Sequence, residues 1–408
     1  MGGFIKNNTF GAVTAKRFVD YLSNQYQLNL DSFYNDWFPT QGYPVVKLDY
    51  FWQSKGQLEV TISQAKDSLE NSMNKYRPRS ISIHAYILYR GDLNLKKVYI
   101  GELDTFIGNF TLSTNTDVAA IFLNPDRASF FRTDYSTIEI PSSVVAHLPA
   151  NDRLGWVSDT IQNLISMRAK TNKNNFIDHL NQTLGFLANE KSPETWLGVI
   201  MVLERFQLVL FDTPMYQMYL YWIKQVIKDI VKSIIRGNES PLSAIRNAFL
   251  MWCLKLEDET TIDYALDSFN HSLSLEDFVY EGAIRFGNCS NFEKILASNH
   301  LSLETISTLA SSRNETQQLI LLDHFKNNSK TVPTILSRYL YYGDYEIVWK
   351  HFKQHPDVKV DLESCIVQMR KKSYILEAQA LAKTVPPIKS GLERQKSYEL
   401  FRQWIQQS

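Results

Sequence analysis

The feature that most constrains the fold is a change in the spacing of apolar residues near position 140. Between residues 45 and 140, apolar and polar residues alternate in short segments, whereas from Pro141 onward the apolar residues recur at helical spacing. Alternation is typical of half-buried strands, and recurrence every three or four residues is typical of amphipathic helices. The sequence therefore predicts an all-β region followed by an all-α region.

The β region contains seven or eight short segments that are rich in β-branched and aromatic residues. Gly, Asn, Asp and Ser separate them, and this pattern predicts a small β-sandwich. A polar stretch at residues 67–79 is expected to form a long loop between strands. The expected strands are residues 45–50, 58–62, 81–88, 98–100, 106–112, 118–123, 130–135 and 137–140.

The α region is a series of amphipathic or buried segments with short linkers, so neighbouring helices should form antiparallel hairpins. Ser192-Pro193 and Ser240-Pro241 are start signals, because Pro is favoured at the first helical position. Gly237 and Gly287 are stop signals. Stacked hairpins without a strict sequence period predict an irregular superhelix of the HEAT or armadillo type. Among the expected helices are residues 193–210, 215–235, 242–256 and 332–352.

The first 38 residues predict short helices. Thr14 can cap a helix that carries the apolar stripe of residues 18–22, and Asp31 can cap a last turn. Pro39 and the turn at residues 42–44 then stop helix formation. A chain of 408 residues is too long for one ordinary domain. We expect three: a helical domain remnant at 1–42, a β-sandwich at 43–140 and a HEAT-like helical domain at 141–408.

The charge balance argues against nucleic acid as the main partner. Lys and Arg total 43, and Asp and Glu also total 43, so the formal net charge is zero. Binding to phosphates needs a concentrated excess of Lys and Arg. No transmembrane helix is predicted either. The longest apolar helical stretch, residues 216–235, is interrupted by four charged side chains, Lys224, Lys228, Asp229 and Lys232.

Two features of the sequence point to different compartments. Cys253, Cys289 and Cys365 form no C-x-x-C pair, and no apolar signal region follows Met1, so a reduced, cytoplasmic setting is favoured. An extracellular setting stays open because N-x-S/T sequons carry meaning in a secreted chain, although many arise by chance in an Asn- and Ser-rich sequence. The sequons begin at Asn7, Asn109, Asn181, Asn238, Asn270, Asn288, Asn314 and Asn327.

The strongest metal-site candidate by spacing is the pair His351 and His355. Histidines at i and i+4 share one helical face and could hold a metal through two imidazoles. A zinc peptidase would need Glu at Phe352 to deprotonate the bound water, and Tyr374 stands where a third ligand would be expected. Pro356 places His355 at a helix end, where a histidine is favourable through the helix dipole alone. A structural role is therefore the favoured interpretation.

No nucleophile or nucleotide site stands in a recognisable signature. The chain has no G-x-S-x-G, no P-loop and no G-x-G-x-x-G. Cys253 lies in the apolar run 249–254 and is expected to be a small core residue. The aromatic cluster at 215–222 could be a ligand or peptide surface, but such a stripe more often packs between helices. The residues by themselves predict a structural or binding role.

Six segments, in order, carry a family resemblance. Residues 4–18 look like the closing part of an M1-family catalytic domain, and residues 28–37 resemble the family's Gly-x-Asp-Leu-x-x-Phe-x-x-x-Trp segment. Gln41-Gly42-Tyr43-Pro44 resembles the start of its β-sandwich. The remaining segments are similar to its closing strand (123–135, with Ser129 in place of Gly), to the Arg-x-x-Leu-x-x-Asp start of its helical domain (152–159) and to its Tyr-x-x-Ala-Ile-x-x-Gly helix (280–287).

The collinear resemblance covers nearly the whole chain and identifies it as the C-terminal half of an M1 (gluzincin) zinc aminopeptidase. The resemblance is to C-terminal domains of the aminopeptidase N-like and ERAP-like kind. The chemistry of this family needs an H-E-x-x-H helix with a downstream Glu on zinc, a Gly-x-Met-Glu-Asn strand for the substrate amine and a Tyr for the oxyanion. In the family all of these lie upstream of the segment that this chain resembles. We therefore expect no catalytic, cofactor-binding or metal residue here, and zinc belongs to the full-length family.

The resemblance implies a module that caps and shapes a peptide-binding chamber and is catalytically incomplete alone. Its expected partners are peptides or a catalytic-domain half. One alternative is a part of an active zinc-dependent aminopeptidase whose catalytic half lies outside this chain. Another is a non-catalytic scaffold that binds peptides or proteins. Exposed apolar surface along residues 1–44 would favour a missing neighbour.

Overall fold

The structure is a computed structural model, and the chain forms two compact units, Met1–Lys170 and Thr171–Ser408. The three-domain division predicted from the sequence stays a prediction. The described residues are 2–7, 12–38, 43–54, 56–66, 78–91, 94–114, 116–166, 175–211, 213–236, 242, 245–271, 276–297, 301–328, 330–356, 358, 361–369, 372–382 and 385–407.

The first unit begins with three short helices, α1 (Gly2–Asn7), α2 (Ala15–Tyr26) and α3 (Asp31–Trp37). Thr14 caps α2 as predicted, because its hydroxyl accepts a hydrogen bond from the Arg17 backbone N–H at 3.2 Å. Asp31 was predicted to be a cap, but the cap position belongs to Leu30 and Asp31 is the first helical residue. Its carboxylate there complements the helix dipole and pairs with Lys16 at 2.9 Å. The predicted stops at Pro39 and Gly42 lie outside the described residues.

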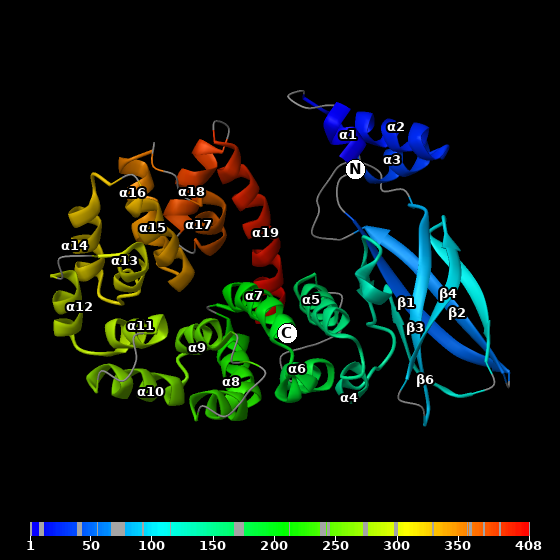
Figure 1. The fold of residues 1–408 in the computed structure, drawn as a ribbon, viewed down its shortest axis with the longest axis horizontal. Coiled ribbons are helices and arrows are strands. Elements are labelled where there is room, and N and C mark those ends of the chain that lie inside the picture. Colours follow the sequence, from blue (N-terminus) through cyan, green and yellow to red (C-terminus); the bar gives the residue numbers. More distant parts are fainter. Residues whose placement is uncertain are drawn as a thin grey trace. The chain divides into compact units, whose positions relative to one another are not determined.

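Seven strands of the described residues form two sheets that pack face to face (Figure 1). One sheet has the order β5-β2-β1-β7 and the other β4-β3-β6. All neighbours are antiparallel except β1 and β7, which are parallel. The strands are β1 (Pro44–Ser54), β2 (Gln57–Lys66), β3 (Ile81–Tyr89), β4 (Leu95–Leu103), β5 (Ile107–Ser113), β6 (Val118–Leu123) and β7 (Arg132–Asp134).

The sandwich core follows from the alternation of the strands. Leu48 and Val60 from one sheet and Ile83 and Ala85 from the other are all fully buried in one cluster. A buried glutamine, Gln64, joins three segments, since its amide exchanges two hydrogen bonds with the Arg79 backbone and donates a third to the Thr105 carbonyl. Of the predicted long loop at 67–79, residues 67–77 lie outside the described residues.

The predicted strand at 137–140 is wrong. These residues form a turn, with the Ile138 backbone N–H bonded to the Tyr135 carbonyl at 3.0 Å. Ile138 packs against the sandwich core, which accounts for the apolar pattern. Two helices then complete the unit, α4 (Ser142–Val145) and α5 (Ala150–Ile165).

The second unit is helical and follows an arc in which α9, α11, α13 and α15 lie on the inner side and α10, α12 and α14 on the outer side (Figure 1). Successive inner helices contact one another, as expected for stacked hairpins. The helices are α6 (Phe176–Leu184), α7 (Pro193–Leu210), α8 (Pro214–Ile235), α9 (Arg246–Lys255), α10 (Glu259–Asn270), α11 (Asp277–Phe286), α12 (Cys289–Leu296), α13 (Leu303–Leu309), α14 (Glu315–Phe325), α15 (Thr331–Tyr342), α16 (Tyr345–Gln354), α17 (Leu362–Gln368), α18 (Lys372–Leu381) and α19 (Pro386–Gln407).

The predicted start and stop signals have mixed outcomes. Ser192 caps α7 through a hydrogen bond from the Thr195 backbone N–H at 3.1 Å, as predicted. The expected single helix at 332–352 is wrong, because Gly343 adopts a left-handed conformation (φ 88°) that ends α15 before α16 begins. Gly287 follows α11 as predicted. The signals at Gly237 and Ser240-Pro241 lie outside the described residues.

The last helix of this unit links the two ends of the arc. Helix α19 packs against α7 and α8 (Figure 1). Arg402 on α19 is buried, and its guanidinium donates to the carbonyls of Val209 at 2.8 Å and Leu208 at 3.0 Å in the last turn of α7. A cation at a helix C-terminus satisfies carbonyls that the helix itself leaves free. Within the described residues, no helix is long and apolar enough to cross a membrane.

Candidate functional site

Among the described residues, the histidine pair at the end of α16 has no third metal ligand beside it. The rings of His351 and His355 lie 4.8 Å apart, and the described residues contain no group of three or more His, Cys, Asp or Glu that could hold a metal ion. Phe352 between them is buried in the helical core. Burial, and to a lesser degree the neighbouring His355, lower the pKa of His351. His351 therefore lies partly within the packing of α16, whereas His355 is exposed at the end of the helix.

The cysteines and the aromatic cluster are mainly core residues. Cys253 is fully buried, as predicted, and burial raises the pKa of its thiol well above the usual value. Cys365 is also buried, whereas Cys289 is exposed at the start of α12. In the aromatic cluster of α8, three residues are buried and one, Tyr221, is 66% exposed. The buried ones are Met215, Tyr219 and Trp222.

A cluster of buried and half-buried charges joins α7 to three of the inner helices, α9, α11 and α15. We call it the inner charge cluster, and it consists of Glu204 on α7, Lys255 on α9, Glu281 and Arg285 on α11, and Arg338 on α15. Lys255 Nζ lies 3.2 Å from Glu204 Oε1, and the side chains are 10% and 19% exposed. Arg338 contacts the carboxylate of Glu281, whose side chain is fully buried.

Two tyrosines at the end of α15 cover the cations of the inner charge cluster. The Lys255 ammonium lies 3.7 Å from the centre of the Tyr341 ring, and the Arg285 guanidinium lies 3.9 Å from that of Tyr342. Such contacts stabilise a cation that has lost part of its water. Arg338 lies over both rings.

Burial is the main cause of the pKa shifts in this cluster. It raises the pKa of the Glu281 carboxyl and lowers the pKa of Lys255, although Glu204 partly restores the latter. Three buried polar atoms, Glu281 Oε1, Arg285 Nε and Arg338 Nε, have no hydrogen-bond partner among the described residues. The cluster therefore keeps unused hydrogen-bonding capacity at atoms that lie out of contact with solvent.

A close approach of two helices places Glu281. Its neighbour Gly282 faces α10, where an added Cβ would come within 2.5 Å of the Ala265 Cβ. Only glycine allows this spacing between α10 and α11. Gly282, at a variable position of the motif at 280–287, therefore has a packing reason, and the same helix brings the Glu281 carboxylate to the inner layer. The sequence patterns did not predict this cluster. The one sign of it in the sequence is a charged residue that interrupts an otherwise apolar helical segment.

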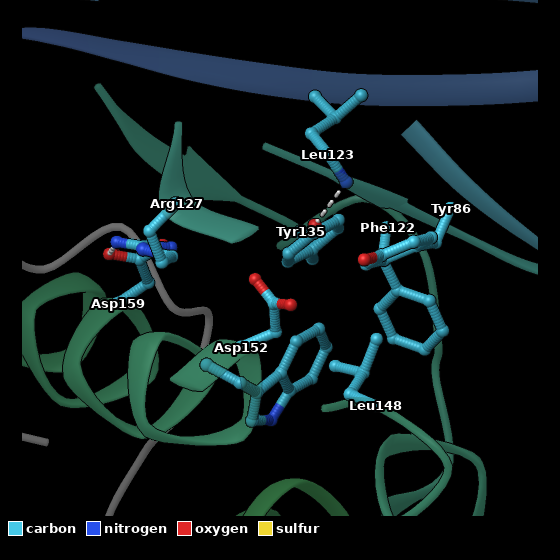
Figure 2. Close-up of a pocket in the computed structure, with 9 residues that line it drawn as sticks. Tyr86, Phe122, Leu123, Arg127, Tyr135, Leu148, Asp152 and Asp159 are labelled. Carbon is cyan, nitrogen blue, oxygen red and sulfur yellow. Dashed lines mark hydrogen bonds and ion pairs between the residues drawn. The ribbon is translucent and has the colours of Figure 1, made fainter. Parts of the chain in front are cut away.

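A second polar site lies in the first unit, where α5 packs against the sandwich (Figure 2). It is a cavity of about 20 Å³, which is enough for roughly one water molecule and too small for a substrate. Figure 2 shows the Asp152 carboxylate pointing into it, and burial raises the pKa of this group. The lining residues are Tyr86, Phe122, Leu123, Arg127, Tyr135, Leu148, Asp152, Trp156 and Asp159.

This junction brings together two of the segments that carry the family resemblance. Arg127 follows β6, and its guanidinium makes two hydrogen bonds to Asp159 on α5, at 2.8 and 3.2 Å. The arginine crosses α5 at Gly155, where an added Cβ would lie 2.6 Å from its Cδ. The backbone here is strained, since Asn124, Asp126 and Arg127 all have positive φ. These contacts hold the turn after β6 in a fixed position against α5. We call this contact the sandwich–α5 joint.

The helices at the start of the chain expose a set of large apolar side chains. Phe4 is buried against Phe18 and Tyr21, but much of the remaining apolar surface faces solvent. Exposed apolar surface of this extent is typical of an interaction site. The exposed residues are Ile5 (62%), Val13 (47%), Tyr26 (62%), Leu28 (55%), Phe33 (49%) and Phe38 (45%).

Two comparisons with known proteins give matches. Residues 120–360 match the family model described as the ERAP1-like C-terminal domain. The fold is similar to that of Legionella pneumophila aminopeptidase A, crystallised in complex with aspartic acid, with a TM-score of 0.56 and 13% sequence identity. The match covers 98% of this chain and 53% of the aminopeptidase, so the chain spans about half the length of that protein. No curated protein sequence matches the chain.

The structural match confirms the predicted fold class, a β-sandwich followed by a HEAT-like superhelix. Because the sequence identity is only 13%, the match supports the fold and no statement about function.

Proposed function

The chain belongs to the ERAP1-like C-terminal domain family, and on this premise we propose that it is the C-terminal module of an M1-type aminopeptidase that bounds a peptide-binding chamber. The observation that carries the proposal is the family match over residues 120–360, together with a fold that follows about half of an aminopeptidase. The module is catalytically incomplete alone and acts through its shape and surface.

The inner charge cluster supports a role in contacting peptides. A peptide backbone presents N–H and C=O groups and a charged end, and it needs partners of both signs. Lys255 and Arg338 supply donors, Glu204 supplies acceptors, and tyrosines lie beside them on the inner layer of the arc. The link through α19 holds the inner helices in a fixed arrangement, which reduces the entropy lost on binding.

Zinc, in this proposal, is held by residues outside this chain. The described side chains do not fit a zinc site, because His351 and His355 lack the third protein ligand that a catalytic centre needs. No step of peptide hydrolysis is assigned to this chain.

Peptide binding by the purified chain tests the proposal. We expect fluorescent peptides to bind, as read by anisotropy, and the variants K255A and R338A to bind them more weakly. K326A is the matched control, since Lys326 is 60% exposed and lies outside the inner charge cluster. We also expect no release of N-terminal residues. A chain that binds no peptide, or that binds stoichiometric zinc and releases N-terminal residues, contradicts the proposal.

The exposed apolar side chains of residues 1–38 favour a second candidate, in which the chain is part of an active enzyme with its catalytic half elsewhere. A search of the neighbouring coding sequence for H-E-x-x-H is the first test. Where such a half exists, it should bind the chain in a pull-down, and F33S should weaken that binding. Capture of unrelated proteins with equal yield would instead support the scaffold alternative.

A further inference from the structure

We infer that this chain carries N-linked glycans, with Asn181 and Asn314 as the best-supported sites, and thus that it passes through a compartment where such glycans are attached. The inference goes beyond the proposed function and does not depend on it. It rests on how often the acceptor motif occurs, on where its asparagines lie and on what their side chains contact.

The motif is twice as frequent as chance predicts. The chain has 27 asparagines, and Ser and Thr together make up 58 of its 408 residues. Roughly four asparagines would therefore have Ser or Thr two positions later by chance, if proline is ignored. The observed number is eight.

The sequon asparagines lie on the surface. For six of the eight, the structure describes the side chain, and each of the six is exposed. They come from both units and from strands, helix starts and helix ends, so no single surface accounts for them. The six are Asn109, Asn181, Asn270, Asn288, Asn314 and Asn327.

The side-chain amides are oriented for attachment at nitrogen. At Asn181 the Oδ1 accepts from Trp222 Nε1 at 3.0 Å, and at Asn314 it accepts from the backbone N–H groups of Thr316 and Gln317. Because these donors are N–H groups, the oxygen must be the atom that faces them. Nδ2 therefore points away and makes no hydrogen bond among the described residues.

Four asparagines outside the motif, three of them buried and Asn247 exposed, show the opposite pattern. Asn124 Nδ2 donates to the Ser129 carbonyl at 2.8 Å, and Asn163 Nδ2 donates to the Thr133 carbonyl at 3.0 Å. Asn247 and Asn291 likewise use Nδ2 as a donor. The side-chain nitrogens of these four asparagines already donate to the protein, whereas those of Asn181 and Asn314 donate to no described residue.

The co-reactant is a lipid-linked oligosaccharide, which a transferase supplies. Nδ2 forms a bond to the anomeric carbon of the first sugar and loses one proton. The bond from that carbon to the lipid pyrophosphate breaks, and the lipid pyrophosphate leaves with the electron pair. The oxidation state of the asparagine is unchanged, and its Oδ1 keeps the contacts described above.

The test uses the protein isolated from its natural source. An amidase that removes N-linked glycans converts each glycosylated Asn to Asp, which peptide mass spectrometry detects. We expect Asp at 181 and 314, and unchanged Asn at 124, 163, 247 and 291. Unmodified asparagine at both 181 and 314 before any enzyme treatment overturns the inference.

Variants expressed in the same cells separate glycosylation from other modifications. T316A should abolish occupancy at Asn314 without touching that residue, and T316S should retain it. N328Q is the matched control, because Asn328 is exposed and also accepts from two backbone N–H groups but has Lys330 two positions later. Equal gel mobility of T316A and the parent protein contradicts modification at Asn314.

Discussion

Arg127 shows how a single side chain can join two elements. Its guanidinium bonds to both oxygens of Asp159, which is nearly buried and also accepts from the Thr133 backbone N–H at 3.1 Å. Asp159 therefore holds β7, α5 and the strained turn after β6 together. Loss of its carboxylate would leave a part-buried guanidinium and a buried backbone donor without this partner.

We therefore expect D159A to lower the free energy of unfolding by about 3 kcal/mol. The matched control is K97A, which removes the pair with Asp126 in which both side chains are roughly half exposed. That change should cost less than about 1 kcal/mol. Urea titration followed by intrinsic tryptophan fluorescence measures both values. Equal losses for the two variants would mean that the Arg127–Asp159 pair does not hold the joint.

Two half-buried histidines predict how stability depends on pH. Burial lowers the pKa of His179 and of His351, so both favour the neutral form in the folded chain. Their usual value in the unfolded chain is 6.5. Above that pH both histidines are neutral in the folded and the unfolded chain, so they do not lower the free energy of unfolding. As the pH falls below it, the unfolded chain binds protons before the folded chain does, and the free energy of unfolding decreases.

The double variant H179Q/H351Q should therefore lose less stability than the parent between about pH 7 and about pH 5. Urea midpoints measured across this range test it. H271Q is the control, because the His271 side chain is 65% exposed. An unchanged slope in the double variant would show that burial of these two rings does not control the acid sensitivity.

At the scale of elements, local sequence patterns predicted the positions of many helices and strands. They did not predict features that depend on contacts with residues far away in the sequence. The alternation within 81–88 and the caps at Thr14 and Ser192 correctly placed β3, α2 and α7. The turn at 137–140 was mistaken for a strand because Ile138 packs on the core without pairing. The predicted helix 332–352 contains Gly343, and glycine in a left-handed conformation commonly ends a helix. The break could therefore have been predicted from the sequence.

The inner charge cluster could not be read from the sequence. Its ion pairs join residues 51 and 57 positions apart, and helical periodicity contains no information about such separations. Charged residues usually lie on solvated faces, whereas Lys255 and Glu281 are almost or fully buried against partners on other helices. The sandwich–α5 joint was nearer to prediction, since both of its segments had been singled out by resemblance.

Gly282 gives a prediction about how α10 and α11 pack. Alanine there would gain helix propensity, but its Cβ would overlap the Ala265 Cβ and force the helices apart. We expect a net loss of about 2 kcal/mol in unfolding free energy. The double variant G282A/A265G returns the missing space and should lose less than the sum of the two single variants. Strict additivity in urea titrations would contradict the close contact.

At the scale of the whole molecule, the sequence order and the spatial order of the second unit differ at one place. Helices α6 to α18 stack mainly on near neighbours, as in other solenoids, which are stabilised by repeats in contact. Helix α19 breaks this rule, because Arg402 bonds to carbonyls of α7 that are 193 and 194 residues away. A link of this kind makes the stability of the first helices depend on the last one.

The substitution R402A tests that dependence. It leaves two backbone carbonyls at the end of α7 without their charged donor, and we expect a loss of about 2 kcal/mol. Hydrogen exchange should rise at the C-terminal turn of α7 and along α19 while α12 to α14 stay protected. R394A is the control on the same helix, since Arg394 is 58% exposed and pairs with Glu363. If exchange rises equally in both variants, or spreads evenly over the arc, then Arg402 does not link its ends.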